Sequence, residues 1–343
     1  MEWVYAGFIA FILALLVLDL GVFHRTAHVV KVREALRWSA VWISLGLAFS
    51  GFIYVGYEHH WLGMGLTRDT MSTPVVAADG TTIYNDGGSA LVKYLTGFIV
   101  EKSLAVDNIF VIAMIFGFFA VPPVYQHRVL FWGILGALLM RGAMIGIGAA
   151  LIARFTWILY VFGGFLILTG VKMLLMRDAE PDLNENRLIK LVRRVLPMTD
   201  QYQEGRFFVR AARTGRLLAT PLFLALMLVE VTDLIFAVDS IPAIFAITTD
   251  PFLVFTSNIF AILGLRSLYF ALAGIIESFK YLKVALSFVL VVIGVKMLTH
   301  SWLKAWLGDS FNFYVLGVVA AILGAGVVAS LIARRTHPPA PLA

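Results

Sequence analysis

Long apolar stretches alternate with polar connections along most of the chain. A stretch of about 17–25 predominantly apolar residues is long enough to cross a bilayer as a helix. Nine such stretches occur, and the third and sixth are longer and more polar than a simple span requires. The predicted helices are 3–23, 40–57, 90–120, 129–153, 155–176, 218–247, 252–275, 281–299 and 312–333. The pattern therefore predicts an all-α, polytopic membrane protein.

The composition supports this fold class and excludes several functions. Of the 343 residues, 60% are hydrophobic and only 14% are charged, which is too few charges to cover a soluble surface. The chain has no cysteine, so disulfides, thiolate metal ligands and cysteine chemistry are excluded. A Gly-rich, Lys-containing phosphate loop is also missing from the sequence, which disfavours ATP-driven pumping. We expect neither an enzyme, nor an organic cofactor, nor a nucleic-acid partner.

The basic residues predict how the chain is oriented in the membrane. The connections place 18 Lys and Arg on one side of the predicted helices and 4 on the other, and five more lie within helices. Because the positive side is normally cytoplasmic, we expect the N-terminus outside and the C-terminus inside a bacterial-type inner (plasma) membrane. Connection 58–89 is then external and connection 177–217 cytoplasmic. Within the latter, the amphipathic stretch 187–195 is either a helix on the anionic inner leaflet or a plain linker.

Two short segments recur along the chain. Ala-Val-Asp-Asn-Ile at 105–109 matches Ala-Val-Asp-Ser-Ile at 237–241, and Gly-Val-Lys-Met-Leu occurs at both 170–174 and 294–298. The matches include charged residues, which argues against coincidence between apolar helices that share a small alphabet. They predict two related units of three helices each.

These units define the predicted organisation of a single transmembrane transporter domain, 1–343. Because three is odd, the second unit enters the membrane from the side opposite to the first. This 3+3 inverted-topology repeat is the arrangement in which secondary transporters form a site at the membrane midplane. The parts are repeat one at 90–176, a cytoplasmic linker at 177–217, repeat two at 218–299, and peripheral helices at 3–23, 40–57 and 312–333.

The first helices of the two units together carry five carboxylates near their middles. They are Glu101 and Asp107 in the first unit, and Glu230, Asp233 and Asp239 in the second. An ionised carboxylate at the centre of a membrane helix costs roughly 2.5–3.5 kcal/mol, so these groups need positive partners. Lys102, Arg141 and Arg266 could neutralise some of them, but we expect a bound cation to be the more economical partner.

Neutral oxygen donors accompany the acids. Asn108 follows Asp107, and Ser240 follows Asp239. Carboxylate, amide and hydroxyl oxygens suit Mn²⁺, Ca²⁺ or Mg²⁺ better than Zn²⁺ or Cu⁺. The predicted metal ligands are Glu101, Asp107, Asn108, Glu230, Asp233, Asp239 and Ser240. Acids six residues apart cannot reach one ion from a regular helix, so we predict helix breaks after Asp107 and Asp239, the second one favoured by Pro242.

Other uses of the same residues remain open at this point. The acids could form ion pairs that hold the two units together, or a proton relay without a metal. An intramembrane aspartyl protease is disfavoured, because the chain has no Gly-x-Gly-Asp segment and more acids than that chemistry needs.

Three segments carry a resemblance to a known family. They are Asp19-Leu-Gly-Val-Phe-His-Arg, Glu101-Lys-Ser-Leu-Ala-Val-Asp-Asn, and Glu230-Val-Thr-Asp-Leu-Ile-Phe-Ala-Val-Asp-Ser-Ile-Pro-Ala-Ile-Phe-Ala. Together with the span pattern, they resemble the TerC family of integral membrane proteins, most of all its Alx-like branch. The resemblance implies export of Mn²⁺ and protection against manganese excess. It also implies that the five acids are needed for transport.

We therefore expect a secondary transporter that exports Mn²⁺, or the related Ca²⁺ or Mg²⁺, by alternating access, with protons as the coupling ion. Asp107 and Asp239 are the expected central ligands. The alternative is a membrane partner without transport activity, which hands metal to secreted proteins or to the secretion machinery.

Overall fold

The computed structural model describes residues 2–21, 31–175, 215–272, 280–300 and 311–336, with short pieces between 194 and 210 and at 302–303. Within these residues the chain is almost entirely helical. The helices are α1 (Glu2–Gly21), α2 (Val32–Glu58), α3 (Gly87–Phe118), α4 (Pro123–Arg154), α5 (Ile158–Leu175), α7 (Pro221–Phe245), α8 (Pro251–Ile262), α9 (Leu265–Leu272), α10 (Lys280–Leu298) and α12 (Phe311–Thr336). The short elements are the 3-10 turn η1 (Trp61–Gly63) and two antiparallel hairpins, β1 (Val75–Val76) with β2 (Thr82–Ile83) and β3 (Phe208–Arg210) with β4 (Leu217–Ala219).

The predicted all-α membrane fold is confirmed. In the described part of the chain, seven helical segments are long and apolar enough to cross a membrane. They are α2, α4, α5, α7, the α8–α9 pair, α10 and α12. The apolar part of α1 is shorter, and α3 has 32 residues but several charged ones. Each of the nine predicted helices thus has a helical counterpart, whereas the predicted surface segment 187–195 lies outside the described residues apart from Arg194.

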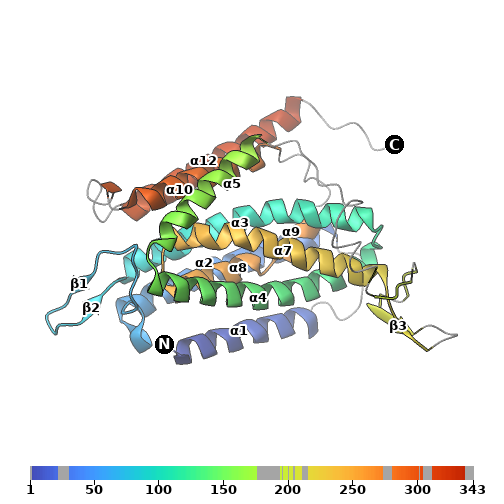
Figure 1. Cartoon of the computed structure of the whole chain (residues 1–343), viewed down its shortest axis with the longest axis horizontal. Helices are drawn as coiled ribbons and strands as arrows, with labels where there is room; N and C mark the ends of the chain where they lie inside the picture. The colour runs from blue at the N-terminus through green and yellow to red at the C-terminus, as the bar shows by residue number, and fades with distance from the viewer. Residues whose placement is uncertain are drawn as a thin grey trace.

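The helices form two layers. Figure 1 shows α2, α3, α4, α7, α8 and α9 running side by side, with α5, α10 and α12 packed together in a second layer that crosses them at an angle. The β1–β2 hairpin extends from one end of the helices and the β3–β4 hairpin from the other (Figure 1). The 59–86 connection and the described residues within 208–219 therefore lie at opposite ends of the helices (Figure 1).

Glycines allow α5 and α10 to cross closely. A Cβ added to Gly170 would lie 2.7 Å from Val291 Cγ2, and one added to Gly294 would lie 2.8 Å from Ile167 Cγ1. Gly170 and Gly294 are 124 residues apart, and so are Ile167 and Val291. The third helices of the two predicted units, α5 and α10, therefore contact each other through corresponding residues. The first helix of each unit likewise packs on the second helix of the other, α3 on α8 and α7 on α4. This is the pattern that the predicted repeat requires, although the repeat itself stays a prediction.

The position of the helix break differs from the sequence prediction. α3 and α7 continue through Asp107 and Asp239. Pro242 lies in the last turn of α7, where it removes one helical hydrogen bond but does not end the helix at Asp239. The break instead separates α8 from α9. It occurs at Gly264, whose φ of +82° favours glycine, and where a Cβ would come within 2.6 Å of Trp42.

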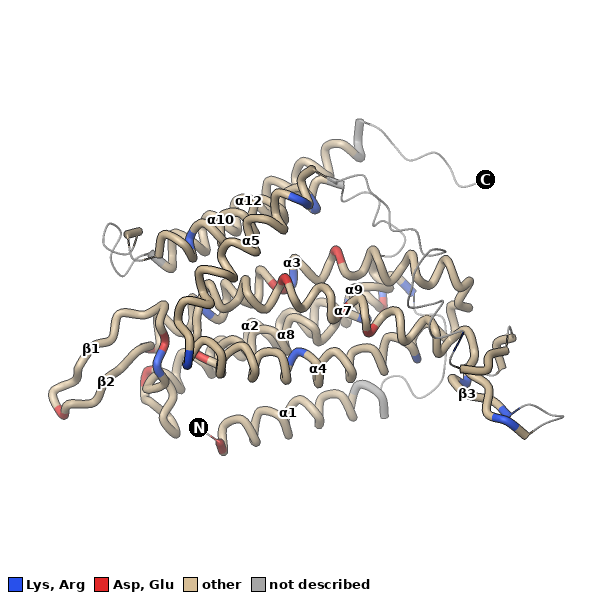
Figure 2. The backbone as a smooth tube through the Cα atoms, in the orientation of Figure 1, with Lys and Arg blue, Asp and Glu red and all other residues tan. Residues whose placement is uncertain are grey.

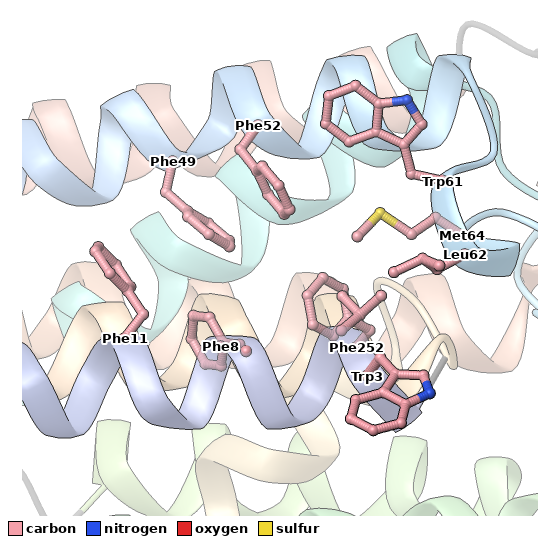
Figure 3. Close-up of a pocket in the computed structure, with 11 residues that line it drawn as sticks. Trp3, Phe8, Phe11, Phe49, Phe52, Trp61, Leu62, Met64 and Phe252 are labelled. Carbon is pink, nitrogen blue, oxygen red and sulfur yellow. The ribbon is translucent and has the colours of Figure 1, made fainter.

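Aromatic side chains connect α1 to the rest of the helices. Its buried residues Val4, Phe8, Ile12 and Leu16 follow a spacing of four and form one stripe. Toward η1 the contact opens into an apolar groove of about 490 Å³, which Figure 3 shows. The groove is lined by Trp3, Val4, Gly7, Phe8, Phe11, Phe49, Phe52, Trp61, Leu62, Met64 and Phe252. Side-chain contacts, and not close backbone packing, therefore hold α1 in place.

A buried polar network attaches the 59–86 connection to the helices, and the sequence patterns did not reveal it. Lys93 Nζ of α3 donates hydrogen bonds to Asp69 Oδ2 at 2.8 Å and to Asn85 Oδ1 at 2.7 Å. Asp69 also accepts hydrogen bonds from Thr248 Oγ1 at 2.6 Å and from the Thr249 N–H at 2.9 Å. The network thus joins the 59–86 connection to α3 and to the segment between α7 and α8.

Two buried carboxylates in this network share one lysine. Burial opposes the ionisation of Asp69, but the charge and hydrogen bond of Lys93 outweigh it and hold the pKa of Asp69 well below its usual range. Burial, together with the negative charge of Asp69, raises the pKa of Asp250 to about 6, although Asp250 accepts a hydrogen bond from the Tyr57 hydroxyl at 3.0 Å. Asp250 is therefore the acid that Lys93 leaves poorly compensated.

The substitution Asp250→Asn should raise the thermal midpoint of the purified protein more at pH 8 than at pH 5. An acid whose pKa is raised by folding adds stability below its unfolded pKa, and that contribution is lost as the pH rises through its folded pKa of about 6. The difference from 3.8 corresponds to at most about 3 kcal/mol. Asp69→Asn is the control and should lower the midpoint at both pH values. An equal change for Asp250→Asn at both values would contradict this assignment.

Candidate functional site

A buried arginine joins the first helices of the two predicted units. Arg141 of α4 is 3% exposed, and its guanidinium forms ion pairs with Glu101 of α3 and Asp233 of α7. The pair with Asp233 is bidentate, with Nη2–Oδ1 at 2.9 Å and Nε–Oδ2 at 3.2 Å. The other contact joins Nη1 to Glu101 Oε1. Such fork geometry gives the strongest kind of Arg–carboxylate pair.

Glycines on α3 and α4 let the helices approach one another around this cluster. A Cβ at Gly133 would lie 3.2 Å from Val229 Cγ1 of α7, and a Cβ at Gly97 would lie 2.9 Å from Ser257 Oγ of α8. Small residues at helix interfaces permit close backbone packing in membrane proteins. Figure 2 shows acidic residues along α3 and α7, between the charged ends of the helical layers. Glu101, Arg141 and Asp233 lie well inside the bounds of α3, α4 and α7, so their ion pairs lie away from the helix ends.

Neutral polar side chains complete the surroundings of the arginine. Asn108 Nδ2 donates a hydrogen bond to Asp233 Oδ1 at 2.8 Å. Arg141 Nη1 lies 3.3 Å from both Ser240 Oγ and Asn258 Oδ1. Asn108 and Ser240 were predicted as site residues, whereas Asn258 was missed. Its only signal in the sequence is an amide in a membrane-spanning helix, where it follows Thr256 and Ser257.

Two buried oxygens of the cluster have no hydrogen-bond donor among the described residues. They are Glu101 Oε2 and Asn108 Oδ1. Asn108 and Asp233 also line a cavity with about 10 Å³ of free volume, close to what one water molecule needs. Its other walls are apolar side chains of α3, α4, α7 and α9. Acceptor oxygens beside a small cavity are suited to hold a small cation.

The expected central ligands lie elsewhere. Asp239 of α7 is half-buried and accepts a hydrogen bond from Thr169 Oγ1 of α5 at 3.2 Å. Asp107 of α3 is half-buried within electrostatic range of Lys283 of α10. Each acid thus faces the α5–α10 layer. Glu230 lies against Gly136 of α4, and its buried Oε2 has no hydrogen-bond partner among the described residues.

The seven predicted ligands are therefore divided. The structure brings Glu101, Asn108, Asp233 and Ser240 together and leaves Asp107, Asp239 and Glu230 apart from them. In the described residues, no three Asp, Glu or His side chains are grouped so that they could hold one metal ion. Arg141 is thus the partner of Glu101 and Asp233 in this structure, and the bound cation stays a prediction. One guanidinium has five donors and pairs with two carboxylates, which leaves only Glu101 Oε2 of their oxygens without a donor among the described residues.

Lys102 also differs from expectation, because its ammonium does not neutralise an acid. Its Nζ donates hydrogen bonds to the carbonyls of Ala261 at 3.0 Å and Leu263 at 3.2 Å. These carbonyls belong to the end of α8, where the helix break leaves them without helical partners. Lys102 thus ties α3 to the break between α8 and α9.

The fold and the site define a multi-pass membrane protein with a buried carboxylate–arginine cluster at its centre. The family model described as "Integral membrane protein TerC family" matches residues 86–337, and the chain belongs to this family. An uncharacterised membrane protein of Myxococcus xanthus is 51% identical over 334 residues, which cover 97% of this chain and 93% of the relative.

Further relatives match over similar lengths. The Alx protein of Escherichia coli (strain K12), whose name describes it as a candidate membrane-bound redox modulator, is 44% identical over 320 residues, 93% of this chain and 91% of its own. An uncharacterised membrane protein of Rickettsia bellii is 39% identical over 332 residues, 96% and 99% of the two chains. No solved structure matches the chain.

Thiol labelling can show whether Asp239 faces water. The chain has no cysteine, so Asp239→Cys introduces a single thiol. We expect a water-soluble methanethiosulfonate reagent to label it at least about tenfold faster than the thiol of Val238→Cys. Val238 is an apolar residue 42% exposed on the same helix, and a thiol that faces lipid ionises poorly. Asn108→Cys is a buried control. Equal labelling rates at positions 238 and 239 would contradict the exposure of Asp239 to water.

Proposed function

We propose that this protein is a secondary transporter that exports a hard divalent cation, Mn²⁺ foremost, from the cytoplasm by alternating access. The observation that carries the proposal is the pair of buried carboxylates, Glu101 and Asp233, within membrane-spanning helices and beside unsatisfied oxygens and a small cavity. Ionisable residues at such positions mark ion pathways in membrane proteins. Membership of the TerC family and the multi-pass fold are in keeping with this function.

The chemistry of the donors supports a hard cation. The residues that would hold the ion centrally are Glu101, Asp233, Asn108 and Ser240, which offer carboxylate, amide and hydroxyl oxygens. These ligands also fit Ca²⁺ and Mg²⁺, so the preference for Mn²⁺ rests on the resemblance to the family. We assign Asp107 and Asp239 to the path between the α5–α10 layer and this centre, and the protons that drive export to the carboxylates of the path.

The orientation that the basic connections predict assigns each part of the site to one side of the membrane. With the N-terminus outside, the segment from α7 to α8 and the Lys93 network lie on the external side. The small cavity beside Asn108 and Asp233 then lies on the cytoplasmic side of Arg141, because its walls include Leu130 and Gly133, near the start of α4. A cation that enters from the cytoplasm would meet these oxygens first.

A second candidate is a membrane partner that hands metal to secreted proteins or to the secretion machinery. The observation in its favour is the external connection, whose buried Asp69–Lys93 pair gives it a defined structure. Direct thiol–disulfide activity, by contrast, needs cysteine, and the chain contains none.

Flux measurements on purified protein in vesicles test the proposal. Wild-type protein should move Mn²⁺, and an imposed pH gradient should change the rate. Asp233→Asn should reduce the flux at least about tenfold, because it removes a central charge. Asp79→Asn, which neutralises an acid of the β1–β2 connection, is the matched control and should transport normally. Ca²⁺ is measured separately to define selectivity.

The opposite result is equally informative. Wild-type protein that is folded and correctly oriented but moves no divalent cation would contradict autonomous transport and favour the partner role.

A further inference from the structure

Arg141 occupies the carboxylate oxygens that a cation would need. Its guanidinium contacts both oxygens of Asp233 and one oxygen of Glu101, so only Glu101 Oε2 remains without a partner among the described residues. A cation and the guanidinium cannot hold these oxygens together, because both are positively charged. Binding of the cation therefore requires the arginine to move.

A displaced arginine needs another acid. Removing one partner of a buried ion pair leaves an uncompensated charge, which is strongly unfavourable. The guanidinium of Arg141 therefore cannot move to an apolar position between the helices. It must reach another carboxylate near α4.

Glu230 is that carboxylate. It lies one helical turn before Asp233 on α7, and a Cβ added to Gly136 of α4 would collide with its carboxyl group. Gly136 precedes Arg141 by five residues, about 7.5 Å along the helix. Side chains of helical residues lean toward the N-terminus of their helix, so Arg141 leans toward the turn that contains Gly136, although the two positions lie about 140° apart around α4. The Oε2 atom of Glu230 is buried and has no hydrogen-bond partner among the described residues.

We propose that Arg141 is a mobile internal counter-ion. It neutralises Glu101 and Asp233 when no cation is bound, a divalent cation displaces it, and Glu230 then receives the guanidinium. This inference rests on the proposed transport function, and it makes Glu230 a receiver for Arg141 instead of a metal ligand.

The exchange explains two properties that an exporter needs. A divalent cation brings two positive charges to the carboxylates in place of the single charge of Arg141, and the attraction increases. A monovalent cation brings no such increase, so the exchange selects for divalent ions. The arginine also keeps the acids neutralised after the cation has left, and an empty site can then return across the membrane without leaving unpaired carboxylates. Arg141 is thus needed for the return of the empty carrier and competes with cation binding.

Binding of Mn²⁺ alone to the purified protein, followed by the paramagnetic resonance of the free ion, tests the exchange. Arg141→Gln removes the competitor and should tighten binding about tenfold. Glu230→Gln removes the receiver and should weaken binding about tenfold. In the double variant the second substitution should have no further effect, because no guanidinium remains to be received. Arg266→Gln is the matched control, since it removes another buried arginine, whose Nη1 lies 3.4 Å from His127, and it should bind normally.

Two outcomes of the binding experiment would overturn the proposal. If Glu230→Gln weakens binding equally with and without Arg141, Glu230 is a ligand of the cation. If Arg141→Gln binds Mn²⁺ as wild type does or more weakly, the arginine does not compete. If Arg141→Gln does not fold, Arg141→Lys takes its place, because it keeps the positive charge. Arg141→Lys should tighten Mn²⁺ binding less than is expected of Arg141→Gln, because an ammonium still competes but cannot bridge both carboxylates in a fork.

Two modes of transport in vesicles separate this inference from the proposed function. Arg141→Gln should lose net Mn²⁺ efflux but keep the exchange of internal for external Mn²⁺, because exchange never requires the empty carrier to return. Loss of both modes in a folded variant contradicts the counter-ion role. Wild-type protein that neither binds nor transports Mn²⁺ contradicts the proposed function itself. If wild-type protein binds and transports Mn²⁺, but the effects of Arg141→Gln and Glu230→Gln on binding are independent, only the counter-ion role is contradicted.

Discussion

The arrangement of the helices depends on the need to neutralise charge within an apolar surrounding. Glu101, Arg141 and Asp233 come from α3, α4 and α7, and none of them could be buried alone at an acceptable free energy. Their ion pairs therefore determine how these three helices meet, and glycines at the contacts allow the necessary approach. The cluster is a structural requirement and, on our account, also the place where transport occurs.

The same balance of charges appears twice in the molecule. In the network around Asp69, Lys93 of α3 pairs with Asp69 and acts on Asp250 by its charge, and at the centre Arg141 pairs with Glu101 and Asp233. In each case one fixed positive charge faces two acids, which leaves an excess of negative charge. The cluster around Asp69 is closed by many hydrogen bonds, whereas the central one keeps unsatisfied oxygens beside a cavity. This difference separates a structural cluster from one that is suited to exchange ions.

Much of the fold could be predicted from the sequence, because apolar runs and basic connections report directly on membrane spans. The central residues were also visible, since a carboxylate in an apolar helix stands out. Arg141 was one of three candidate partners for the acids, but the actual contacts were not visible, because Arg141, Asn258 and Lys102 reach their partners across helices that are far apart in the sequence. Helix breaks were misplaced for a related reason. Pro242 marks a helix end by its local chemistry, whereas the break at Gly264 depends on contact with Trp42 of a distant helix.

The most direct test of this account is a structure determined with Mn²⁺ bound, in which the metal is located by its anomalous scattering. The account predicts Mn²⁺ between the carboxylates of Glu101 and Asp233, with the guanidinium of Arg141 moved to Glu230. A structure in which Arg141 keeps both ion pairs, with Mn²⁺ bound elsewhere, would contradict it.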